Sequence, residues 1–300
     1  MVALMTVPET TTSPRRNSAG LRRDLELLEV LGAPESENNG GLGVVRLAEL
    51  VGRDKGQVSR TLATLADIGL VARDPQTLAY RLGYQLYALA ARTLESRLVR
   101  EAAPYLRRVV TATHETAHLC VLRGENVLTL TSELSEYAFR GIGWEGVSVA
   151  AWRTSSGRVL VSDWGDEDLR RWYELHGKDR LVLGQTSPVT NPRTPRRALD
   201  SGPRLPDPVV VEGTPLITDF ASLLREVKHI RARGFATVDE EFEMGVVGVS
   251  APVYDFRGSI IAALNVSAPK TRLGAHLDQV GALTAKIAAE LSAQLGAPMT

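Results

Sequence analysis

A chain of 300 residues is long enough for two domains, and its 44% apolar and 23% charged residues are typical of an ordinary globular protein. Its 35 basic and 35 acidic residues cancel, so net charge neither favours nor excludes a nucleic acid as partner. A single cysteine, Cys120, excludes an internal disulfide and any multi-cysteine metal site, and its apolar neighbours predict a buried thiol. No apolar run reaches the length of a membrane span and no hydrophobic signal core is present, so we expect a cytoplasmic protein without membrane contact.

The N-terminal part predicts a tail followed by helices. Residues 1–18 are polar and rich in Thr and Pro, which indicates a disordered tail. A first helix is expected over 21–31 and a second over 44–51, with a Gly/Asn/Glu-rich loop between them. The residues expected to face the core from the first helix are Leu21, Leu25, Leu28 and Leu31.

A third helix is expected directly after the short turn Gly52-Arg53. Asp54 is well placed to cap this helix, and Gln57 to close a capping box. Two short extended runs around Asp74-Pro75 then predict a small hairpin. Helix, helix, turn, helix and hairpin is the order of a winged helix-turn-helix, which we expect over residues 19–82.

The outward face of the third helix suits DNA. With Val58, Leu62 and Leu65 directed inward, Arg60 points outward as the natural donor to a guanine edge or a phosphate. The expected DNA-contacting residues are Lys55, Gln57, Ser59, Arg60 and Thr64 on this helix and Arg73 and Arg81 on the hairpin. The alternative is a solvated helix face on a sensor or protein-interaction module that does not bind DNA.

The remainder predicts a second domain of the α+β class. An amphipathic linker helix is expected over 83–98, and Pro104 is expected in the first turn of a further helix. Residues 99–300 mix helices and strands without strict alternation, and the Pro/Arg-rich residues 183–212 predict an inserted loop. Within this part we expect helices over 218–234 and 275–295 and strands over 246–255 and 259–268.

One short motif matches the pattern of zinc peptidases. His114-Glu115-Thr116-Ala117-His118 spells H-E-x-x-H, in which both rings must share one helix face and a third ligand comes from elsewhere. Here a helical pattern ends and a strand begins inside the motif, so the two histidines are expected on different elements, at the surface or at a strand edge. We therefore expect neither an enzyme nor a metal or cofactor, and a zinc hydrolase using His114, Glu115 and His118 remains the alternative.

The whole pattern resembles the isocitrate-lyase-regulator (IclR) family of bacterial transcription factors over nearly all of residues 20–296. The resemblance rests on VRLAELVGRDKGQVSRTLATLADIGLVARD and YRLG in the N-terminal part, on RTSSGR at 153–158, and on the segment 214–269. It implies a winged helix-turn-helix joined by a linker helix to a GAF-like ligand-binding domain. It also implies homodimers or homotetramers that bind double-stranded, pseudo-palindromic operator DNA under the control of a small-molecule effector.

The resemblance further implies an effector pocket whose lining differs from that of some members. Members that bind small carboxylates line it with an Asp, a Cys and two Ser, where this chain has Val238, Gly248, Asn265 and Ser267. The expected effector-contacting residues are Trp152, Ser155, Ser156, Gly157, Val238, Gly248, Asn265 and Ser267. These replacements predict a roomier, more apolar pocket and an effector larger and less charged than glyoxylate or pyruvate. The alternative is an effector-independent regulator.

Overall fold

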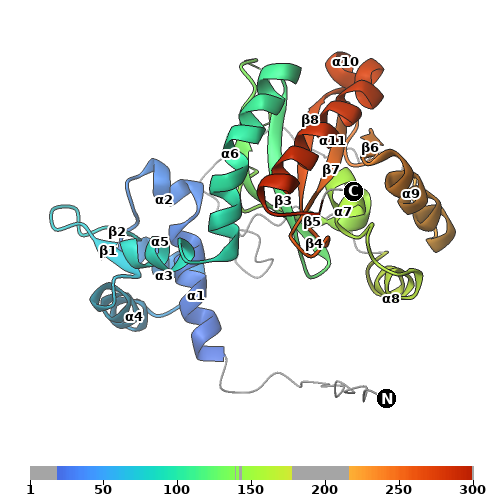
Figure 1. The fold of residues 1–300 in the computed structure, drawn as a ribbon. Helices are drawn as coiled ribbons and strands as arrows, with labels where there is room; N and C mark the ends of the chain where they lie inside the picture. Colours follow the sequence, from blue (N-terminus) through green and yellow to red (C-terminus); the bar gives the residue numbers. More distant parts are fainter. Residues whose placement is uncertain (1–18, 139, 142–143, 178–215, 299–300) are drawn as a thin grey trace, which may run out of the picture. The chain divides into compact units, whose positions relative to one another are not determined.

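The computed structural model describes residues 19–138, 140–141, 144–177 and 216–298 (Figure 1). These residues form two units, which meet in the chain at Ala90 and Ala91. The expected tail over 1–18 and the expected inserted loop over 183–212 lie outside the described residues. No helix in the described ranges has the length and apolar character needed to cross a membrane.

The first unit consists of helices and a two-stranded hairpin. Its elements are α1 (Ala19–Leu31), α2 (Pro34–Asn38), α3 (Val44–Val51), α4 (Lys55–Asp67), β1 (Val71–Arg73), β2 (Tyr80–Leu82) and α5 (Tyr84–Ala90). Strands β1 and β2 pair antiparallel, with Ala72 opposite Arg81. The expected loop between the first two long helices therefore contains the short helix α2, which begins at a proline, a residue well suited to a first helical position.

The core of the first unit shows that the predicted inward stripe of α1 was partly wrong. Leu27, Val30 and Leu31 are buried in it, whereas Leu21 and Leu25 are 64% and 46% exposed. Helix α1 carries leucines on two adjacent stripes, and spacing alone does not show which stripe the neighbouring helices cover. Only the C-terminal half of α1 packs against the core formed by α3 and α4.

The predicted linker helix over 83–98 was also wrong, because two helices occupy this region. Helix α5 ends at Ala90, and α6 (Leu94–Thr113) begins after Thr93, whose hydroxyl accepts a hydrogen bond from the Ser96 amide at 3.3 Å. Pro104 lies inside α6 rather than in its first turn. A 20-residue helix that packs along its length in the core tolerates one missing backbone hydrogen bond.

The second unit is built on one antiparallel sheet of six strands in the order β5-β4-β3-β8-β7-β6. After α6, its elements are β3 (Thr116–Arg123), β4 (Asn126–Glu133), β5 (Ser148–Ala150), η2 (Ala151–Arg153), α7 (Ser155–Leu160), α8 (Asp166–His176), α9 (Phe220–Arg233), β6 (Ala236–Asp239), β7 (Val246–Tyr254), β8 (Ile260–Pro269), α10 (Lys270–Leu273), η4 (Gly274–His276) and α11 (Leu277–Gln294). Helices and an antiparallel sheet make this an α+β fold, as predicted, and the four elements expected over 218–295 are present.

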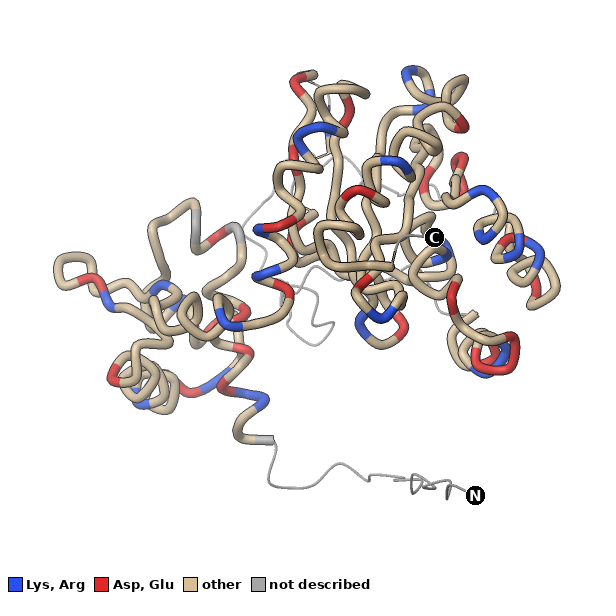
Figure 2. The backbone as a smooth tube through the Cα atoms, in the orientation of Figure 1, with Lys and Arg blue, Asp and Glu red and all other residues tan. Residues whose placement is uncertain are grey.

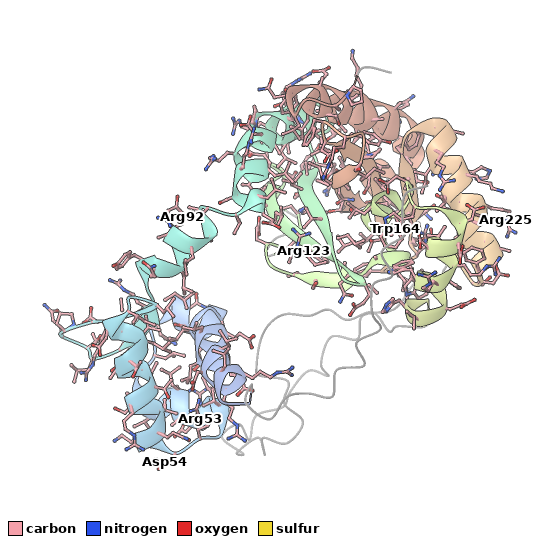
Figure 3. The ribbon with its side chains drawn as sticks, turned by 60° about the horizontal axis from the view of Figure 1, so that its bottom comes forward. Arg53, Asp54, Arg92, Arg123, Trp164 and Arg225 are labelled. Atoms are coloured by element: carbon pink, nitrogen blue, oxygen red, sulfur yellow. The ribbon has the colours of Figure 1, made fainter. Side chains whose placement is uncertain are left out.

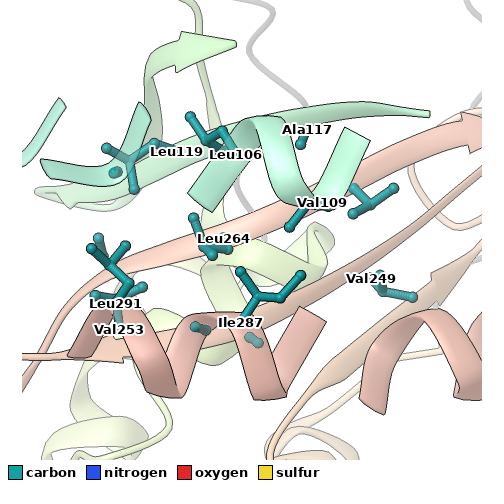
Figure 4. Packing of buried hydrophobic residues seen from close by; sticks show 14 of the residues in the cluster. Leu106, Val109, Ala117, Leu119, Val249, Val253, Leu264, Ile287 and Leu291 are labelled. Carbon is teal, nitrogen blue, oxygen red and sulfur yellow. The ribbon is translucent and has the colours of Figure 1, made fainter. Parts of the chain in front are cut away.

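The alternation of side chains along the strands assigns each face of the sheet its own environment. On β3, Ala117 and Leu119 join a core with α6 and α11, and Leu264 of β8 reaches the same core (Figure 4). The opposite face is covered by α7, α8 and α9, whose apolar side chains form a second core with Cys120. Residues His118 and Cys120 therefore point away from α6 and α11, because successive side chains of a strand alternate between faces.

Candidate functional site

The turn between α3 and α4 is tight and well anchored. Gly52 adopts a left-handed conformation with φ of 63°, and its amide caps α3 by donating to the carbonyls of Ala48 and Glu49. Asp54 then starts α4 by accepting a hydrogen bond from the Gln57 amide at 3.0 Å, as predicted. Among the described hydrogen bonds, the reciprocal bond of a capping box from the Gln57 side chain is absent. Figure 3 shows Arg53 and Asp54 at this turn.

Arg53 connects the turn to the first helix. Its Nη1 donates to the carbonyl of Arg23 at 2.7 Å and to Asp24 Oδ1 at 3.2 Å, and its side chain is only 11% exposed. The hydroxyl of Thr61, on α4, contacts the same carboxylate at 3.5 Å. Asp24 therefore holds α1, the turn and α4 together, and Arg53 is used for positioning rather than being free to contact a partner.

The outward face of α4 has the phase expected from the sequence. Val58 and Leu62 are completely buried in the core of the unit. Of the predicted contact residues on this helix, Lys55, Gln57, Arg60 and Thr64 are exposed and Ser59 is half-buried. The buried valine and leucine thus fix which side of α4 a partner could reach.

The hairpin carries the other two predicted contact residues. Arg81 is exposed, and the Arg73 guanidinium lies 5.5 Å from the centre of the Tyr80 ring. In the turn, Asp74 accepts hydrogen bonds from the Thr77 and Gln76 amides at 2.7 and 2.9 Å, and these bonds lower the pKa of its carboxyl group. Basic and acidic positions are interleaved over this unit (Figure 2), so electrostatic attraction to a partner would be local.

The second unit contains a cavity of about 530 Å³ on the face of the sheet opposite α6 and α11. Side chains of β3, β7 and β8 form its floor, and the start of α7 forms one wall. Connecting segments contribute Trp144, Phe242 and Met244. The Trp144 and Phe242 rings lie 6.1 Å apart in an edge-on arrangement. A volume of this size is in the range that binds small organic molecules.

Six of the eight predicted effector-contacting residues line this cavity. They are Ser155, Ser156, Val238, Gly248, Asn265 and Ser267. Gly157 and Trp152 do not line it. A Cβ atom on Gly157 would lie 2.0 Å from the carbonyl oxygen of Ala151, so the glycine permits close backbone packing instead. Trp152 is buried in the second core, where its indole Nε1 has no hydrogen-bond partner among the described residues.

A cluster of hydroxyl groups lies at the polar end of the cavity, where Ser155 and Ser156 belong to the lining and both bond to the completely buried Ser250. Ser250 Oγ lies 2.8 Å from Ser155 Oγ and 3.0 Å from Ser156 Oγ. Asn265 Nδ2 donates to Ser250 Oγ at 2.9 Å and to the carbonyl of Val249 at 3.1 Å. The sequence reasoning missed Ser250, which bonds to lining residues without belonging to the lining itself. Its position two residues after Gly248 on the same strand could have placed it on the same face.

The prediction that His118 lies at the surface or at a strand edge was wrong. The side chain is buried in a central strand and contributes to the cavity lining. Its Nδ1 lies 2.9 Å from Ser132 Oγ and its Nε2 lies 2.9 Å from Ser267 Oγ, so both ring nitrogens are already engaged. Burial lowers the pKa of this imidazole to about 4, which keeps it neutral at pH 7.

The rest of the H-E-x-x-H motif plays structural roles. His114 ends α6 in a left-handed conformation with φ of 58°, so the two histidines lie on different elements, as expected. Glu115 is buried and bonds with both carboxylate oxygens to Arg272, at 2.5 and 2.7 Å. No group of three or more His, Cys, Asp or Glu in the described ranges could hold a metal ion. The geometry gives a zinc hydrolase no support.

Cys120 is buried, as predicted, but it also lines the cavity. Burial raises the pKa of its thiol to about 11, and its Sγ lies 3.8 Å from Thr129 Oγ1. The thiolate form is therefore scarce at neutral pH, and the side chain acts as an apolar wall element with a weak hydrogen-bonding capacity.

A buried ion pair holds the segment 153–158 in place. Arg158 is fully buried and donates to both carboxylate oxygens of Glu241, at 3.0 and 2.6 Å. Glu241 also accepts a hydrogen bond from the Leu216 amide at 2.7 Å, and its carbonyl accepts one from Arg153 at 3.0 Å. Because Glu241 precedes Phe242, this pair fixes the wall formed by α7 relative to the segment that carries the aromatic wall. The sequence alone did not indicate this pair.

Comparison with known proteins identifies related sequences over most of the chain. The family model described as "Bacterial transcriptional regulator IclR C-terminal" matches residues 91–190 and 210–293, together more than half of the chain, and the model HVO_A0114 matches residues 22–82. The transcriptional regulator BhcR of Paracoccus denitrificans is 27% identical over 281 residues, which cover 92% of this chain and 88% of the relative. KdgR of Escherichia coli is 27% identical over 257 residues, covering 85% and 86%. These relatives are transcriptional regulators and not enzymes.

Solved structures show the same fold. Thermotoga maritima IclR covers 92% of this chain and 98% of its own with a TM-score of 0.66 and 21% identity. An IclR homologue from Microbacterium hydrocarbonoxydans, crystallised with 4-hydroxybenzoate, covers the same shares of the two chains with a TM-score of 0.69 and 20% identity. At these identities the likeness concerns the fold.

Proposed function

This chain belongs to the IclR family of bacterial transcriptional regulators, and on that premise we propose that it binds specific operator DNA and that a small molecule in the second unit modulates this binding. The observation that carries the proposal is the outward face of α4. This face presents exposed polar side chains from a helix whose opposite side is locked into a packed core. Such a protein acts in the cytoplasm, where bacterial DNA lies.

The first unit has the element order of a winged helix-turn-helix, in which α4 would enter the major groove and the β1–β2 hairpin would flank it. Arg60 is the residue best suited to a guanine edge, and Lys55, Gln57, Ser59 and Thr64 would share base and phosphate contacts. Arg73 and Arg81 on the hairpin would contact the DNA backbone. The relatives' names support transcriptional regulation, and this chain's own geometry supports the assignment to α4.

The second unit would serve as the effector-binding domain, of the GAF-like type, with its cavity as the binding site. In a homodimer or homotetramer, an effector that prefers one placement of the DNA-binding units shifts the population toward that placement. Because the DNA fixes the spacing of the operator half-sites, the placement of the two DNA-binding units sets the affinity of the protein for its operator. The homologue bound to 4-hydroxybenzoate supports a small-molecule ligand for a protein of this fold.

Fluorescence anisotropy with labelled DNA tests the proposal. The full-length protein is titrated against DNA from upstream of its own gene and from neighbouring promoters, and against scrambled DNA of equal length, across a salt series. We expect tight, sequence-dependent binding that weakens steeply with salt, with a logarithmic slope of about −0.9 per phosphate neutralised. Equal affinity for scrambled and promoter DNA, or a shallow salt dependence, would contradict the proposal.

A further inference from the structure

The chemistry of the cavity specifies its ligand more closely, and this inference rests on the function proposed above. The lining of the cavity combines an apolar wall with a polar end. The apolar wall contains the Trp144 and Phe242 rings, which meet edge-on at 6.1 Å, and Met244 beside them. Aromatic faces of this kind pack well against a flat ring. The polar end is formed by Asn265 and Ser155, both of which bond to the buried Ser250.

The orientation of the Asn265 amide decides what this polar end offers a ligand. One end of the amide lies 3.1 Å from the carbonyl oxygen of Val249, which can only accept a hydrogen bond, so that end must be the nitrogen. The same nitrogen reaches Ser250 Oγ at 2.9 Å and Ser155 Oγ at 3.3 Å. No described residue donates to Asn265 Oδ1, and the residue borders the cavity. The open position at the polar end is therefore an acceptor, which a ligand satisfies with an O–H or N–H group.

Three cations close to the cavity lining, the buried Arg158 and the partly exposed Arg272 and Lys270, already have acidic partners. Arg158 lies next to the α7 wall and forms its bidentate pair with Glu241. Arg272, which follows the lining residue Thr271, is bonded to Glu115. Lys270, on the other side of Thr271, lies 2.9 Å from Asp239 and 2.6 Å from Glu240.

The remaining groups of the lining add no buried positive charge. Among the described lining residues, the charged ones are Arg140 and Glu243, which have opposite signs. Arg140 is exposed to solvent and donates to the Tyr137 carbonyl at 2.8 Å. The imidazole of His118 is neutral at pH 7, and both of its nitrogens are engaged. A carboxylate placed at the polar end would therefore lose its hydration without gaining a cationic partner, which is unfavourable.

From these observations we infer that the cavity binds an uncharged aromatic compound that bears a hydroxyl group. Its ring packs against Trp144 and Phe242, and its hydroxyl donates to Asn265 Oδ1. The cavity volume of about 530 Å³ leaves room for a substituent on the ring larger than a carboxylate. Selection against negative charge follows from the acidic partners that already engage Arg158, Arg272 and Lys270 rather than from size.

Isothermal titration calorimetry on the full-length protein without DNA tests this inference with two matched pairs of ligands at pH 7. The first pair, 4-hydroxybenzamide and 4-hydroxybenzoate, is similar in shape and differs in charge. The second pair, methyl 4-hydroxybenzoate and methyl benzoate, differs in the hydroxyl group. We expect the carboxylate to bind at least about tenfold more weakly than the amide, because its charge stays uncompensated. Methyl benzoate should bind at least about fivefold more weakly than its hydroxylated partner, because Oδ1 is left without a donor.

An Asn265→Ala variant then locates the hydrogen bond. In this variant the affinity ratio between methyl 4-hydroxybenzoate and methyl benzoate should fall towards one. The control is Ser162→Ala, which removes a buried hydroxyl outside the cavity lining, bonded to the Val159 carbonyl at 2.7 Å, and should preserve the ratio. Because the ligand pairs are first compared on the unaltered protein, poor folding of a variant does not remove the test.

Several results would overturn the inference. These are equal or tighter binding of the carboxylate, no effect of the hydroxyl group, or no binding of any of the four compounds at millimolar concentration. The anisotropy assay with promoter DNA is separate and needs no ligand. Specific DNA binding with failed calorimetry would reject the ligand class alone, whereas ligand binding without specific DNA binding would reject the proposed function alone.

Discussion

Replacing Glu241 by glutamine should strongly destabilise the second unit, because it leaves a buried guanidinium without its counter-charge. The Arg158 side chain is 0% exposed and that of Glu241 is 7% exposed, so water cannot compensate for the loss. Both carboxylate oxygens accept from Arg158, and Oε2 also accepts from the Leu216 amide. Removing one partner of such a buried pair costs about 3–5 kcal/mol.

Urea denaturation followed by tryptophan fluorescence measures this change. All four tryptophans, Trp144, Trp152, Trp164 and Trp172, lie in the second unit, so their emission reports on that unit and not on the first. With a typical dependence on urea of about 1–3 kcal/mol per molar, the midpoint should fall by more than about 1 M. We expect the transition to stay cooperative and to move as a whole.

Two further variants serve as a control and as a rescue for the urea measurement. Glu290→Gln breaks the exposed pair with Arg108 and should leave the midpoint nearly unchanged, since both side chains are in contact with water. Replacing Arg158 and Glu241 together by methionine should recover part of the lost stability, because no unpaired charge remains. With a dependence of about 1–3 kcal/mol per molar urea, a shift of less than about 0.3 M corresponds to less than about 1 kcal/mol. A urea midpoint for Glu241→Gln within that range of the unaltered protein would show that the Arg158–Glu241 pair does not hold the α7 wall of the cavity.

Three further predictions follow from the two candidate sites. Arg60→Ala should weaken specific operator binding by about 1–3 kcal/mol and relax the preference at one base pair, while Arg171→Ala on α8 should not; an unchanged footprint and affinity would reject the role of Arg60. Burial lowers the pKa of the His118 imidazole from 6.5 to about 4. Between these two pH values the unfolded chain binds a proton at His118 that the folded protein does not. The free energy that neutral, buried His118 contributes to folding is therefore complete above pH 6.5 and is lost as the pH falls towards 4. The loss amounts to about 3 kcal/mol of folding stability. Over this pH range the urea midpoint of the His118→Gln variant should fall less than that of the unaltered protein. Urea midpoints that depend on pH in the same way in both proteins would contradict the lowered pKa of His118. Burial raises the pKa of the Cys120 thiol from 9.0 to about 11, which leaves little of the reactive thiolate at pH 8. At this pH a disulfide reagent should modify Cys120 in the native protein at least about a hundredfold more slowly than in the urea-unfolded chain. Equal rates would show that the thiol is accessible.

The sequence predicted the local features of the DNA-contact face well. The spacing of Val58 and Leu62 sets the phase of α4, and Asp54 caps it, because helix phase and caps depend on residues three or four positions apart. The same reasoning failed for α1, where two leucine stripes compete and the neighbouring helices decide which one is buried. It also failed at Ala90, since the amphipathic pattern continues across the break between α5 and α6.

For the cavity, the resemblance located much of the floor but not the chemistry of its end. Gly248, Asn265 and Ser267 were named in advance, whereas Ser250 and His118 were not. His118 lies in a central strand because β8 pairs with β3 on its other side. Nothing within a few residues of His118 indicates that pairing.

The amino-acid sequence by itself thus determined the helix-turn-helix and hairpin of the first unit, the phase of α4 and the set of small and polar residues available to the cavity. The tertiary structure alone decided which charges cancel. Arg158 meets Glu241 across 83 positions of the chain, and Arg272 meets Glu115 across 157. Local periodicity extends over a turn of helix or a pair of strand residues, whereas the partner of a buried charge is chosen by packing between distant segments. The pairing of Arg158, Arg272 and Lys270 with acidic side chains, on which the ligand inference depends, is a property of the folded second unit.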